Sequence, residues 1–396
     1  MKIFNNFGIK SKNIGLMYLN SIFAGMLFFI PILALYFQEN LFTLTNVALI
    51  FSIQAIGFVV FQYPTGAIAD IIGRKKTLVA AVVINILGVI FLAFGHSMLM
   101  FIFYAIISSL GNSLFSGADS ALIWDTLKQE KKEKYYKKII GTKYALWPVG
   151  AAAGSVVGGY LAAYSLSYPI FLSFFPMTIA LIAVALMKEP KYKKGCHKNI
   201  AKHMWKSSGV IIKNYQLVIL LLSALIFVGI GDSVHSFKPI FYQFLNIPII
   251  YFGYIFGIGF ALSSLGHYFS HDVAKVMGDK KAIIFACFML TLSIFLSSFA
   301  NLWLAVGILL LGQIFYGIGR PVTEHLINLE TQSSIRATIL SGYNLMRFIG
   351  VAMFTPLLGY FAQIYNISIG FRIGAAIMFI IPILFLFLRK NKPTSL

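Results

Sequence analysis

Twelve long apolar runs constrain this chain more than any other feature. Each is unbroken for about 20 residues, the length that a helix needs to cross roughly 30 Å of hydrocarbon. None alternates with a period of two, so the runs predict helices rather than barrel strands. Only 11% of the residues are charged, against about 25% in soluble domains. We therefore expect an all-α membrane protein with twelve transmembrane helices. The runs are Ile14–Phe37, Thr45–Ile68, Thr77–Phe94, Met98–Ile123, Thr142–Tyr164, Tyr168–Met187, Leu217–Phe237, Ile249–Ser270, Ala282–Phe299, Leu302–Thr323, Thr338–Tyr360 and Ile369–Leu388.

The cations predict the orientation in the membrane. The chain has 32 Lys and Arg residues against 12 Asp and Glu, and nearly all of these cations lie at the two ends or in every second connection. Cytoplasmic loops carry such an excess, so we expect both termini in the cytoplasm and the chain in the cell (inner) membrane. The charge then attracts anionic membrane lipids and requires no nucleic acid. Cys196 and Cys287 predict neither a disulfide framework nor a metal site.

The chain is predicted to contain two six-helix halves. A lysine-rich stretch at 188–213 reads as a cytoplasmic linker between residues 1–187 and residues 214–396. The halves resemble each other, since Gly73 and Gly278 follow the second run of each half in similar surroundings. Two related halves with binding sites between them are typical of transporters.

The connection after the second run resembles a known family signature. It reads Gly, three residues, Asp, two residues, Gly and then cations, as in the loop between helices 2 and 3 of the major facilitator superfamily, although Ile71 stands where a cation is usual. The resemblance implies the major facilitator fold and a gate in which Asp70, Arg74 and Asp125 hold the cytoplasmic side shut. The alternative is an ordinary basic loop. The residues of this gating motif are Gly66, Asp70, Gly73, Arg74, Lys75 and Asp125.

The fifth run carries a glycine stripe that is similar to the antiporter motif of the same family, with Ser155 in place of a proline. The resemblance implies export, whereas close helix packing alone is the alternative. The buried arginine of many proton-coupled exporters is absent from the fourth run, where Ile107 occupies its position. The stripe comprises Gly150, Gly154, Gly158 and Gly159.

Polar residues within the runs are candidates for binding and coupling, because a charge costs at least ~2.5–3.5 kcal/mol there. Arg347 is expected in the cavity, with one half of a buried ion pair as the alternative. Asp232 is the predicted proton carrier and Glu324 the next candidate. Arg320, four residues before Glu324, is expected to pair with it as a structural gate rather than to bind solute. The full set is Arg347, Asp232, Trp147, Asn344, Gln313, Arg320, Glu324, Asn20 and Asn112.

These patterns together favour a secondary active transporter that moves a small organic solute by alternating access, most consistent with a proton-coupled antiporter for efflux of drugs or metabolites. Uptake or facilitated diffusion of a nutrient or organic anion is the alternative. A channel or an intramembrane enzyme is less favoured, because no filter segment or catalytic motif occurs. We expect a monomer that requires no cofactor and has a proton and membrane lipids as further partners.

Overall fold

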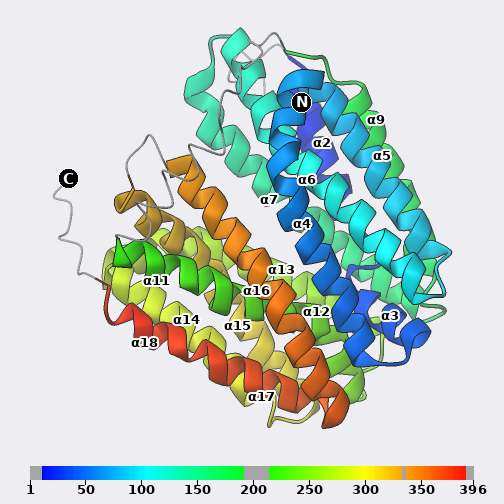
Figure 1. The fold of residues 1–396 in the computed structure, drawn as a ribbon, viewed down its shortest axis with the longest axis vertical. Coiled ribbons are helices and arrows are strands. Elements are labelled where there is room, and N and C mark those ends of the chain that lie inside the picture. The colour runs from blue at the N-terminus through cyan, green and yellow to red at the C-terminus, as the bar shows by residue number, and fades with distance from the viewer. Residues whose placement is uncertain (1–10, 191–213, 332–335, 389–396) are drawn as a thin grey trace. The chain divides into compact units, whose positions relative to one another are not determined.

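The computed structural model of the protein describes residues 11–190, 214–331 and 336–388 (Figure 1). Over these residues the chain contains helices and no β-strand. Twelve segments of the described chain are helical, long enough and apolar enough to cross a membrane. The predicted all-α fold class with twelve transmembrane segments is therefore confirmed. Most of the predicted linker, residues 191–213, lies outside the described residues.

The chain divides into two compact units. Unit 1 comprises Met1–Leu41, Ile56–His197 and Pro248–Gly257, and unit 2 comprises Phe42–Ala55, Lys198–Ile247 and Ile258–Leu396. The helices α4 (Leu44–Ile72) and α13 (Ile250–Met277) each contribute to both units. The halves at 1–187 and 214–396 remain a prediction.

Unit 1 is built around two closely packed helix pairs. Helix α2 packs against α7 and α9, and α5 packs against α6 and α9 (Figure 1). Its helices besides part of α4 and the start of α13 are α2 (Asn13–Gly25), α3 (Leu33–Leu41), α5 (Arg74–Ala93), α6 (Met98–Gln129), α7 (Tyr136–Ala162), α8 (Tyr168–Leu172) and α9 (Phe174–Ala185).

Unit 2 repeats this packing with later helices. Helix α12 packs against α16, and α14 packs against α15, as α2 does against α7 and α5 against α6. The repeat therefore extends from sequence to helix packing. Its helices besides parts of α4 and α13 are α11 (Tyr215–Ser223), the π-helical turn η3 (Ala224–Val228), α12 (Gly229–Phe244), α14 (Asp279–Ser297), α15 (Leu302–Leu329), α16 (Arg336–Ile364), α17 (Ile367–Met378) and α18 (Ile380–Phe385).

Several predicted helix bounds were wrong. The first run is not one helix, because α2 ends at Gly25 and α3 begins at Leu33. The backbone N–H of Phe28 in this break donates to the hydroxyl of buried Ser173 at 3.0 Å, so a side chain replaces the missing helical bond, as a low-dielectric environment demands. Helix α6 instead continues to Gln129, beyond the predicted end at Ile123.

Candidate functional site

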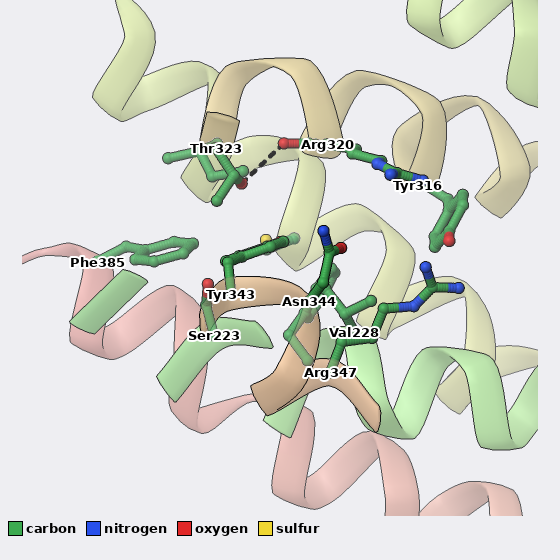
Figure 2. A pocket seen from close by; sticks show the side chains of 13 residues that line it. Ser223, Val228, Tyr316, Arg320, Thr323, Tyr343, Asn344, Arg347 and Phe385 are labelled. Carbon is green, nitrogen blue, oxygen red and sulfur yellow. Dashed lines mark hydrogen bonds between the residues drawn. The ribbon is translucent and has the colours of Figure 1, made fainter. Parts of the chain in front are cut away.

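A pocket in unit 2 contains both arginines among the candidate binding residues. The space between its lining atoms, open solvent included, is about 480 Å³. Figure 2 shows the labelled side chains of α15 facing those of α16, with Phe385 of α18 beside them. The lining residues are Ser223, Phe227, Val228, Ile283, Cys287, Tyr316, Gly319, Arg320, Thr323, Tyr343, Asn344, Arg347 and Phe385.

Two glycines position the charges beside this pocket. A Cβ added to Gly229 on α12 would lie 2.7 Å from Cα of Gly350 on α16, and one added to Gly350 would lie 1.9 Å from the carbonyl oxygen of Leu225. The two backbones therefore touch at a point that only glycine allows. Asp232 follows Gly229 by three residues and Arg347 precedes Gly350 by three, so both lie about one turn from the contact.

Asp232 and Arg347 form an ion pair. The Nε of Arg347 donates to Oδ2 of Asp232 at 2.5 Å, and the side chains are only 25% and 20% exposed. The hydroxyl of Tyr316 on α15 donates to the other carboxylate oxygen at 3.4 Å. Figure 2 shows this hydroxyl and the guanidinium of Arg347 on the same side of the pocket. Arg347 thus has both roles that the sequence left as alternatives, since it lines a pocket and belongs to an ion pair.

The other polar groups of the pocket are held less firmly. Arg320 donates to Glu324 at 3.2 Å on the same helix, but the two side chains are 47% and 45% exposed. Asn344 has no hydrogen-bond partner among the residues that the structure describes, and its amide points into the pocket (Figure 2). An amide and a weakly paired guanidinium are therefore available to a ligand. Sequence reasoning did not single out Tyr343, which is buried in a helix of mostly apolar residues.

The remaining candidates for binding lie away from this pocket. Gln313 precedes Tyr316 by about one turn of α15 but is not part of the lining. In unit 1, the side chain of Asn20 donates to the carbonyl of Ala180 at 3.2 Å, and Asn112 accepts from Asn85 at 3.3 Å.

Trp147 of unit 1 does not line the unit 2 pocket, and its side chain is exposed. Its backbone carbonyl oxygen would lie 2.3 Å from a Cβ at Gly25. Trp147 therefore occupies, at the α2–α7 contact, the place that Arg347 occupies at the α12–α16 contact, and the ion pair has no counterpart there.

The gating motif contains one predicted ion pair and one unexpected helix cap. Nε of Arg74 donates to Oδ2 of Asp125 at 3.3 Å, whereas the surroundings of Gly66 and the side chain of Asp70 lie outside what the structure describes. Gly73 has φ +114°, a conformation that favours glycine. The carboxylate of Glu189 accepts the backbone N–H groups of Arg74 at 2.7 Å and Lys75 at 2.9 Å. Glu189 thereby caps helix α5, where a negative charge is favourable.

The glycine stripe of α7 is a packing surface. Added Cβ atoms at Gly150, Gly154 and Gly158 would lie 1.9, 2.9 and 1.7 Å from backbone atoms of α2 and the break that follows it. Gly159 faces the backbone of Gly253, which belongs to the same unit. Close helix contact therefore accounts for the whole stripe.

Unit 1 also contains a buried ion pair that sequence reasoning missed. The ammonium group of Lys143 on α7 donates to Asp119 on α6, and both residues are below 9% exposed. Asp119 also accepts from the hydroxyl of Ser120 at 3.0 Å. Lys143 follows a lysine-rich connection, so its sequence context indicated solvent rather than burial.

This architecture defines a class of protein. Twelve segments able to span a membrane, two units with repeated helix packing and a charged pocket lined by such segments are the features of a multi-pass solute transporter. Comparison with known proteins agrees with this class. The family profile of the Major Facilitator Superfamily matches residues 15–350, so the chain belongs to the major facilitator superfamily.

Individual relatives are distant. The chain is 25% identical over 237 residues to the uncharacterized MFS-type transporter YxaM of Bacillus subtilis (strain 168), and the match covers 58% of each protein. Its fold is similar to the crystal structure of the nucleoside transporter NupG, with a TM-score of 0.78 at 14% identity over 96% of this chain and 99% of the other. A D-xylose-proton symporter gives a TM-score of 0.77 at 14% identity over 97% and 99%. At 14% identity, these two structures show that the chain shares the fold of known transporters.

Proposed function

We propose that this chain is a proton-coupled secondary transporter that moves a small organic solute by alternating access, with the Asp232–Arg347 pair as its coupling element. The observation that carries the proposal is the 2.5 Å contact between Nε of Arg347 and Oδ2 of Asp232 beside a pocket. A charge pair so far out of water adds little stability, because its desolvation offsets most of its attraction.

The pair has two states that differ in charge. Protonation neutralises Asp232 and removes its attraction for Arg347, whereas the guanidinium keeps its charge. The two residues lie on different helices, about one turn from the contact between Gly229 and Gly350. A proton on Asp232 therefore changes the interaction between α12 and α16, which is the kind of bistable element that coupling requires.

The direction of transport depends on how proton and solute share the pair. Competition for one group gives exchange and hence efflux, whereas joint binding gives cotransport and hence uptake. The resemblance of the glycine stripe to the antiporter motif favoured efflux, but close packing of α7 against α2 and the break after it is sufficient to explain these glycines. Direction therefore rests on the chemistry of the pocket.

The setting of the proposal follows from charge and contacts. We propose a monomer in the cell membrane with both termini in the cytoplasm. The concentration of cations in alternate connections supports this orientation. The pair Arg74–Asp125, at 3.3 Å, then lies at the cytoplasmic side, where it acts as part of the gate.

A cysteine at Gly319 tests alternating access without knowledge of the solute. A Cβ at this pocket-lining residue would have Cδ1 of Ile283 at 3.7 Å as its nearest neighbour, so Gly319→Cys fits. The background is Cys196→Ser/Cys287→Ala. In oriented vesicles, an impermeant thiol reagent should reach this cysteine from either side, with the ratio of the two rates shifted by a proton gradient. Labelling from one side only, unchanged by the gradient, would refute alternating access.

A further inference from the structure

We infer that the transported solute is an organic anion with an aromatic or similar apolar body, and that it binds in the unit 2 pocket together with a proton. The inference rests on the proposed function and specifies the substrate class of the same site. It starts from the two guanidinium groups in the lining, Arg320 and Arg347.

The two members of the ion pair differ in what they can do when separated. Arg347 stays charged under all physiological conditions, but Asp232 can accept a proton. An anion that replaces Asp232 at Arg347 leaves a carboxylate without its counter-charge, and loss of hydration favours the protonated form of that carboxyl. The site then holds the same net charge before and after binding.

A cationic solute cannot be bound at this ion pair with the same charge compensation. It would have to replace Arg347 at Asp232, and the guanidinium would remain charged and unpaired at a site where its side chain is only 25% exposed. Such an uncompensated charge is strongly unfavourable. The chemistry of the pair therefore selects an anion, and it makes anion binding and proton binding mutually favourable rather than competitive.

The rest of the lining fits an anion with an apolar body. Among the residues that the structure describes, the hydrogen bond of Arg320 goes to Glu324 in an exposed pair, and such pairs on a helix surface are weak. Its guanidinium is thus available as a second positive group, and the amide of Asn344 can donate hydrogen bonds. Four rings line the same space and offer faces for stacking: Phe227, Tyr316, Tyr343 and Phe385.

The charged and titratable groups around Asp232 lie on α12 itself and on the helices near it. Helix α16 contributes Arg347, and α15 contributes Arg320 and the hydroxyl of Tyr316. On α17, Arg372 donates to Ser298 at 3.2 Å, and the turn η3 has no titratable residue. On α12 itself lie His235 and Lys238. His235 is a second titratable side chain on the same helix, one turn from Asp232, so it supplies the control.

Three probes with one ring and different charges test the inference: benzenesulfonate, benzenesulfonamide and phenyltrimethylammonium. Calorimetry on the purified protein at neutral pH, in two buffers of different protonation enthalpy, measures affinity and proton uptake together. Benzenesulfonate should bind tightest and take up about one proton per molecule bound. Arg347→Ala should weaken its binding by at least about tenfold, and Arg347→Lys should restore little because a point charge does not reproduce the planar fork.

The carboxyl variant separates coupling from binding. Asp232→Asn should bind benzenesulfonate at least as tightly as wild type but without proton uptake, while His235→Gln should retain the uptake. Tightest binding of the cation, equal binding of all three probes, or no binding of any would overturn the inference. If the labelling of Gly319→Cys still switches sides in that case, the proposed transport function stands and only the substrate class fails.

Discussion

The glycine stripe of α7 predicts a large effect of a single methyl group. In Gly158→Ala, the new Cβ would lie 1.7 Å from the carbonyl oxygen of Phe28, well inside the 3.0 Å that real Cβ atoms keep. The neighbour is backbone, so relief requires α7 to move away from the break after α2. Overpacking of this kind costs about 1–3 kcal/mol.

The same helix supplies a matched control. A Cβ at Gly141 of α7 meets no atom within 4 Å, and alanine there should stabilise an exposed helix by up to about 1 kcal/mol. The two variants should therefore differ by about 2–4 kcal/mol. The assay is the temperature at which half of the detergent-purified protein is lost from the monodisperse gel-filtration peak. Equal melting of Gly158→Ala and wild type would show that α7 and the break after α2 do not approach as closely as argued.

Two further variants test local interactions. Lys143→Met should lower the free energy of unfolding by about 3–5 kcal/mol, because it leaves Asp119 buried and unpaired. In thermal unfolding, Asp119→Asn/Lys143→Met should recover most of this loss; a double variant as unstable as the single one would argue against a charge effect. Glu189→Gln should lower stability by roughly 1 kcal/mol, the value of a helix cap, whereas Glu133→Gln should not, since Glu133 has no hydrogen bond or ion pair among the described residues; equal melting of these two would exclude the capping role.

The transmembrane segments could be predicted because one local property determines them. A chain in hydrocarbon must satisfy its backbone hydrogen bonds internally, so each long apolar run becomes helical whatever surrounds it. The break after Gly25 depends instead on a hydroxyl of Ser173 that meets the N–H of Phe28 from far along the chain. No local pattern encodes that meeting.

The candidate site was predictable as a set of residues but not as an arrangement. Burial cost alone singled out Asp232 and Arg347, yet they lie on different helices and sequence spacing could not join them. The contact between Gly229 and Gly350 joins them. A usable signal was present, because Gly350 of α16 corresponds to Gly150 of the stripe on α7. Close packing of α7 through Gly150 implies close packing of α16 through Gly350. Glu189 was missed because its neighbours are lysines typical of a linker.

The most direct test of the coupling role of Asp232 compares two modes of transport in proteoliposomes. Radiolabelled benzenesulfonate is followed first as accumulation driven by an inward proton gradient, and then as exchange across the membrane without a gradient. Wild type should perform both. Asp232→Asn should lose gradient-driven accumulation and retain exchange, which also shows that the variant is folded and binds solute. Accumulation against a gradient by Asp232→Asn would contradict the account and make Glu324 the next candidate for the proton.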